Sequence, residues 1–77
     1  MSEMGWLLTE LQEEHRISLN FLIREGISKK SYINLRNGGL PTFERFCKIL
    51  RAFRLPREKQ QQALYRAYQI ILRDYQQ

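Results

Sequence analysis

The stretch of sequence that decides the fold is SLNFLIREGISKKSYINLRNGG, residues 18–39. It holds two short segments with apolar residues, each preceded by a serine that favours a helix N-cap and each followed by glycine, which ends a helix. We therefore predict two short helices, over about residues 18–25 and about residues 29–37. A very tight turn that contains Gly26 joins them.

Three further stripes of apolar residues, spaced every three or four positions as in a helix, flank this pair. They are Leu7, Leu8 and Leu11; Phe43, Phe46, Cys47, Leu50 and Phe53; and Leu64, Ala67, Tyr68, Ile71, Leu72 and Tyr75. The first predicts a helix over about Trp6–His15. The others follow the start signals Pro41-Thr42 and Pro56. No alternating run of β-branched residues is long enough for a strand, so we expect an all-α, compact five-helix domain.

The size and composition of the chain indicate one globular domain. Apolar residues make up 43% of its 77 residues and aromatic residues 12%, which is more than disordered chains carry. The single cysteine, Cys47, excludes an intramolecular disulfide framework and a four-cysteine zinc site. The acidic N-terminal region and the short apolar runs argue against a signal peptide and a transmembrane segment. We expect a cytoplasmic protein with no membrane partner.

Charge is distributed unevenly along the chain. The net charge is +5. Residues 1–25 contain five acidic and two basic residues, whereas residues 26–77 contain eleven basic and three acidic ones. Such asymmetry favours nucleic acid or an acidic membrane surface as the partner.

Two short helices joined by a tight glycine-containing turn, the second with a basic outer face, are typical of the helix-turn-helix. The region from Trp6 to Leu55 resembles the lambda-repressor-like helix-turn-helix domains, the Cro and xenobiotic-response-element group of bacterial and phage regulators. The residues that carry the resemblance are Ile27-Ser28, Ser31, Leu35, Asn37 and Gly38, then Pro41-Thr42-Phe43-Glu44, Phe46, Lys48, Ile49, Ala52, Phe53 and Leu55. It implies a DNA-binding domain over residues 1–55, followed by a C-terminal amphipathic helix over residues 56–77.

The first of the two short helices departs from the family pattern, and two alignments remain open. If Gly26 is the turn glycine, Leu22 replaces the family's usual alanine and Glu25 replaces its usual apolar residue before the glycine. Alternatively, the helix is one residue short. In this alternative, Ser18, Leu22 and Ile23 occupy the positions at which the family usually has the cap residue, a leucine and an alanine.

Helical geometry selects an outward face on the second short helix. At about 100° per residue, Tyr32 and Leu35 share the side that must face the aromatic residues of the following helix. The outward residues are then Lys29, Lys30, Ile33, Asn34 and Asn37.

The resemblance implies base contacts at the first, second and sixth residues of this helix, Lys29, Lys30 and Asn34. Lysine can donate to guanine O6 and N7, asparagine can pair with adenine N6 and N7, and an exposed Ile33 can meet a thymine methyl group. The resemblance also implies phosphate contacts at Ser18, Asn37 and Gly38, and charge alone adds Arg36.

Three arrangements are open for the last helix. It packs on the core, pairs with its twin in a homodimer, or lies on a membrane, although a polar face that mixes glutamine with arginine weakens the membrane alternative. The homodimer alternative assigns its interface to Leu64, Tyr68, Ile71 and Tyr75.

These patterns together predict a sequence-specific double-stranded DNA-binding transcriptional regulator, a small repressor that binds an operator as a homodimer. The alternative is a protein-binding module on the same scaffold, such as an antitoxin or a small inhibitor or adaptor. We do not expect an enzyme, because His15 has no second histidine or nearby cysteine, Cys47 lies on an apolar stripe, and Glu13 and Glu14 point about 100° apart. No metal, cofactor or small-molecule substrate is expected.

Overall fold

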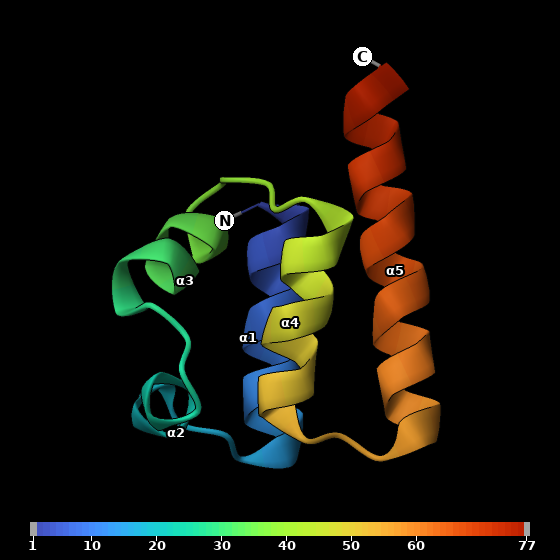
Figure 1. Cartoon of the computed structure of the whole chain (residues 1–77). Helices are drawn as coiled ribbons and strands as arrows, with labels where there is room; N and C mark the ends of the chain where they lie inside the picture. The colour runs from blue at the N-terminus through green and yellow to red at the C-terminus, as the bar shows by residue number, and fades with distance from the viewer. Residues whose placement is uncertain (1, 77) are drawn as a thin grey trace.

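The computed structural model describes residues 2–76, and the ends of the predicted domains at residues 1 and 77 lie outside that range. The described chain forms five helices, α1 (Glu3–His15), α2 (Leu19–Arg24), α3 (Lys29–Arg36), α4 (Phe43–Phe53) and α5 (Arg57–Gln76), and contains no strand. This confirms the all-α prediction. Figure 1 shows α2 and α3 on one side of α1 and α4, with α5 on the opposite side.

Each of the first four helices begins at a hydroxyl side chain that caps it. Ser2, Ser18, Ser28 and Thr42 accept hydrogen bonds from the backbone N–H three residues ahead, at 3.0, 3.1, 3.4 and 3.1 Å respectively. Three of these caps confirm the predicted helix starts. The fourth, Ser2, starts α1 three residues earlier than expected, because its cap and the complete burial of Met4 stabilise another turn.

Glycine ends both short helices. Gly26 has φ +99° and Gly38 has φ +125°, in the region that favours glycine over other residues. The helices stop at Arg24 and Arg36, one residue before the predicted limits. The Ser18 cap and the complete burial of Leu22 agree with the shorter alternative for α2, although Ile23 is 36% exposed.

The predicted apolar stripes form one core. Leu7, Leu8 and Leu11 of α1 pack with Tyr32 and Leu35 of α3 and with Phe46, Leu50 and Phe53 of α4. The rings of Tyr32 and Phe53 lie 6.4 Å apart between centroids. Two members of the α4 stripe are less buried than expected. Phe43 is 45% exposed and packs edge-on against Tyr68 of α5, and Cys47 is only half-buried.

α5 packs on the core, which was one of the three predicted arrangements. Ala63 and Ala67 are buried, and Leu64, Ile70 and Ile71 are partly buried against the core. Small alanine side chains allow α5 to lie close to α1 and α4. No helix within residues 2–76 has both the length and the apolar character that crossing a membrane requires.

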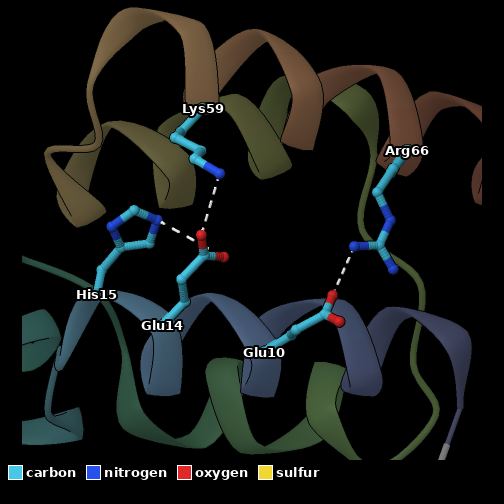
Figure 2. Close-up of polar contacts among 5 residues, drawn as sticks. All are labelled: Glu10, Glu14, His15, Lys59 and Arg66. Atoms are coloured by element: carbon cyan, nitrogen blue, oxygen red, sulfur yellow. Dashed lines mark hydrogen bonds and ion pairs between the residues drawn. The ribbon is translucent and has the colours of Figure 1, made fainter.

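Three ion pairs also join α5 to α1, and the sequence patterns missed them. They are Glu3–Arg73 at 2.6 Å, Glu10–Arg66 at 2.5 Å and Glu14–Lys59 at 3.1 Å. The glutamates nearer the end of α1 pair with basic residues nearer the start of α5. The two helices therefore run antiparallel. Figure 2 shows the second and third pairs, with His15 beside Glu14.

Candidate nucleic-acid interface

α3 presents the outward face that helical geometry predicts. Tyr32 and Leu35 are buried, whereas the four residues predicted to contact bases are exposed: Lys29, Lys30, Ile33 and Asn34. Ser28 supplies the cap that orients the first turn of the helix. The face combines two ammonium groups, an amide and an aliphatic side chain. These are groups that can hydrogen-bond to base edges or pack against a thymine methyl group.

Asn34 is held against the loop that follows α3. A Cβ atom added to Gly39 would lie 2.9 Å from Asn34 Nδ2 and 3.1 Å from the Asn34 carbonyl oxygen. The Gly39 N–H donates to that carbonyl at 3.0 Å. Only a residue without a side chain therefore leaves room for the Asn34 amide in this position.

One flank of α3 faces α1 across a cavity of about 380 Å³, the α1–α3 hollow. Its lining includes Gln12, Glu13, Arg16, Ser18 and Arg36. The structure thus brings together Ser18 and Arg36, two of the predicted phosphate contacts. Ser18 Oγ accepts from the Phe21 N–H at 3.1 Å, and its own O–H can still donate. Arg36 is half-buried, and its buried Nε has no hydrogen-bond partner among residues 2–76.

The other two predicted phosphate contacts lie at the end of α3. Asn37 is the C-cap residue and is exposed. The Gly38 N–H donates to the Leu35 carbonyl at 3.4 Å, so this amide is used within the chain. Asn37 therefore has a side-chain amide that can bind a phosphate, whereas the N–H of Gly38 is part of the turn that ends α3.

The opposite flank of α3 faces α4 across a cavity of about 190 Å³, the α3–α4 hollow. Its polar lining comes from Ser28, Ser31 and Asn34 on the α3 side and from Arg45 and Lys48 on α4. Sequence reasoning missed Arg45 and Lys48 as candidates. Their i, i+3 spacing, opposite the apolar stripe of α4, was the available signal, but only the packed structure places them beside α3.

Ion pairing separates the basic residues into two groups. Arg54 pairs with Glu25 at 2.8 Å, and three basic residues of α5 pair with α1. The basic residues of α3 and the exposed ones of α4 have no carboxylate partner within residues 2–76: Lys29, Lys30, Arg36, Arg45, Lys48 and Arg51. The acidic N-terminal region thus pairs with three of the four basic residues of α5. Within residues 2–76, positive charge without an ion pair remains on α3 and α4, and also at Arg16, Arg24 and Arg57.

The side chains considered for other chemistry lie away from this face. His15 Nε2 is 4.0 Å from Glu14 Oε2, and the Glu14 carboxylate also contacts Lys59 (Figure 2). Attraction to Lys59 lowers the pKa of the Glu14 carboxyl. In the described part of the chain, no three His, Cys, Asp or Glu side chains are grouped so as to hold a metal ion.

The residues predicted for a dimer interface divide into two pairs. Leu64 and Ile71 are partly buried against the core of their own chain. Tyr68 and Tyr75 are 53% and 87% exposed. With Tyr65 and Leu72, they form the exposed apolar face of α5, which we call the α5 tyrosine face.

Comparison with known proteins gives no match: no family model, no curated protein and no solved structure is similar to this chain.

Proposed function

We propose that this chain is a sequence-specific double-stranded DNA-binding transcriptional regulator of the lambda-repressor-like helix-turn-helix type. In this proposal α2 and α3 are the helix-turn-helix, and α3 enters the major groove. The observation that carries the proposal is the separation of charge. Ion pairs with α1 neutralise three of the four basic residues of α5, whereas the basic residues around the exposed face of α3 have no carboxylate partner in the described chain. Unpaired positive charge attracts phosphates and steers association.

Each residue of the interface has a chemical role in this proposal. Lys29 and Lys30 donate to guanine O6 and N7, and Asn34 pairs with adenine. Ile33 packs against a thymine methyl group. Ser18, Arg36 and Asn37 contact phosphates, which set the position of α3 along the duplex.

In the proposed mechanism the protein acts by occupying a DNA site and catalyses no reaction. A bound protein covers an operator and acts as a small repressor in the cytoplasm of a bacterial host or phage-infected cell. Affinity, operator concentration and salt then determine the regulatory effect, because the phosphate contacts release counterions.

We also propose that the regulator binds its operator as a homodimer through the α5 tyrosine face. Arg66 is the only charged residue of α5 between Gln60 and Leu72, and it is paired with Glu10. Two copies of a chain with net charge +5 repel least where their surfaces carry no net charge. Exposed aromatic side chains that are grouped in this way mark contact surfaces. A dimer would read two half-sites about one helical turn apart.

Selection from a random pool of DNA duplexes, followed by quantitative gel shift over a salt series, tests this function. We expect a preferred sequence with half-site symmetry and an affinity that falls steeply with salt. Asn34→Ala should cost about 1–3 kcal/mol on the preferred duplex and relax selectivity at one base pair. The matched control Gln62→Ala removes an exposed amide from α5 and should leave binding unchanged.

The alternative function, docking of a partner protein on the same scaffold, predicts a different result. Equal wild-type affinity for selected and scrambled duplexes, unaffected by loss of Lys29, Lys30 and Asn34, would rule out sequence reading by α3. A partner bound by apolar contacts would also show only weak salt dependence.

A further inference from the structure

Two hollows with basic side chains lie on opposite flanks of α3. Arg36 lines the α1–α3 hollow, and Asn34 lines the α3–α4 hollow. Because these two residues are two positions apart, their side chains leave the helix about 200° apart. The exposed face with Lys30 and Ile33 lies between them.

This arrangement has a consequence for a helix bound in the major groove of DNA. The major groove is about 12 Å wide, and a sugar-phosphate strand forms each of its walls. A helix of about 10–12 Å diameter that enters the groove therefore approaches phosphates on both flanks. The α1–α3 hollow, with Ser18 and Arg36, can serve only one of the two strands.

The α3–α4 hollow has the composition that the second strand requires. Arg45 and Lys48 are exposed, and neither forms an ion pair with any residue from 2 to 76. No acidic residue lines this hollow. Arg45 and Lys48 also line a second cavity, together with Thr42, Glu44 and Arg51. The charged residues that line the α3–α4 hollow itself are all basic.

We propose that Arg45 and Lys48 of α4 bind the phosphates of the DNA strand opposite the one held by Ser18 and Arg36. This inference rests on the proposed function and extends the DNA interface from α3 to α4. The arginine guanidinium can hold a phosphate through two parallel hydrogen bonds, and the lysine ammonium adds a mobile point charge. Asn34 lines the same hollow, so the phosphate contact fixes the strand beside the base that Asn34 reads.

A charge-matched pair of double variants tests the proposal. Arg45→Gln with Lys48→Gln removes the two cations of the α3–α4 hollow. Arg57→Gln with Lys59→Gln removes two exposed cations of α5 that line neither hollow. Both variants lose the same net charge. In gel shift on the selected duplex over a salt series, the first should flatten the slope of log affinity against log salt by about 1.8, and the second by less than about 0.5.

Phosphate ethylation interference supplies the position of the contacts. Wild-type protein should be sensitive to ethylation at two groups of phosphates, one on each strand of a half-site. The Arg45→Gln/Lys48→Gln variant should lose sensitivity at one group only. The Arg36→Gln variant should lose sensitivity at the group on the other strand.

The possible results separate this inference from the proposed function. If wild-type protein binds a preferred sequence and Asn34→Ala weakens it, but the two double variants behave alike, the α4 contact is overturned and DNA reading by α3 stands. These cations would then serve another partner, such as an acidic protein segment. If wild-type protein shows no salt-dependent preference for any duplex, both proposals fail together.

Discussion

Tyr32 joins α3 to α1 through a polar contact at the edge of the core. The residue is fully buried, and its hydroxyl donates to Gln12 Oε1 at 2.7 Å. Gln12 Nε2 in turn donates to the Ile17 carbonyl at 3.0 Å, which ties the start of α2 to the same network. We expect Tyr32→Phe to lower the free energy of unfolding by about 1 kcal/mol, because the Gln12 oxygen loses its donor. Urea unfolding at neutral pH measures this loss.

The same residue predicts a dependence on alkaline pH. Burial raises the pKa of the Tyr32 phenol above its ordinary value of 10.0, and the charge of Arg36 acts weakly in the opposite direction. A group whose pKa is raised by folding stabilises the protein below its unfolded pKa, and this contribution is lost as pH rises. The stability advantage of wild type over Tyr32→Phe should therefore shrink above about pH 10. An advantage that grows there would contradict the buried, neutral phenol.

Gly39 lies against Asn34, which the proposed function assigns to a base contact. A methyl group at residue 39 would lie 2.9 Å from Asn34 Nδ2, so Gly39→Ala must displace that amide. We expect this variant to keep its helical circular dichroism but to lose about tenfold in affinity for the preferred duplex, with relaxed selectivity at the Asn34 base pair. The control Gly38→Ala strains a backbone with φ +125° and should reduce stability more than selectivity. Unchanged selectivity in Gly39→Ala would show that Asn34 does not need its present position.

At the scale of whole helices, the ion pairs between α1 and α5 hold the last helix on the core. The hydrogen bond and the charge of Lys59 lower the pKa of the Glu14 carboxyl below its ordinary value of 4.5, with a smaller effect from His15. A carboxyl whose pKa is lowered by folding stabilises the protein above its unfolded pKa, and this contribution is lost as pH falls. Glu14→Gln should therefore lower the melting temperature slightly at neutral pH, and the difference from wild type should vanish near pH 3.

The neighbouring carboxylate provides a matched control for this pair. Glu13 is exposed and forms no ion pair within residues 2–76. Glu13→Gln should leave the melting temperature almost unchanged at both pH values. Added salt should also reduce the effect of Glu14→Gln, because exposed pairs are screened. Equal effects of the two substitutions would show that the Glu14–Lys59 contact does not stabilise the α1–α5 packing.

In the molecule as a whole, α5 has one face buried against the core and one exposed face, the α5 tyrosine face. One face packs on α1 and α4, so removing the helix would damage the core as well as any interface. Substitutions at exposed positions separate the two effects. We expect Tyr68→Glu with Leu72→Glu to convert a dimer into a monomer in sedimentation equilibrium, with unchanged helical circular dichroism. A wild-type chain that is monomeric at high concentration would rule out the dimer.

A control variant with one added negative charge accompanies that experiment. Asn20→Glu adds a negative charge to an exposed position of α2, on the side of the molecule opposite α5 (Figure 1). It should leave self-association as in wild type. Dissociation by this single charge would indicate that net charge, and not the α5 tyrosine face, governs assembly.

Local patterns in the sequence were enough to predict the number of helices, most of their limits and the inward side of α3. These features depend on local rules: a hydroxyl caps the N–H groups of the next turn, glycine adopts a positive φ, and apolar residues repeat with the helical period. Ser18, Ser28 and Thr42 were predictable for that reason. The early start of α1 was missed because its signal, Ser2, precedes the apolar stripe by a full turn.

Which positive charges remain unpaired depends on how the helices pack together. The Glu10–Arg66 and Glu3–Arg73 pairs join residues 56 and 70 positions apart, and no local pattern predicts which distant helices will lie side by side. The same holds for Arg45 and Lys48, which only the packing of α4 beside α3 brings to the flank of the exposed face of α3. Coulomb attraction depends on distance in space, whereas capping and periodicity depend on distance along the chain.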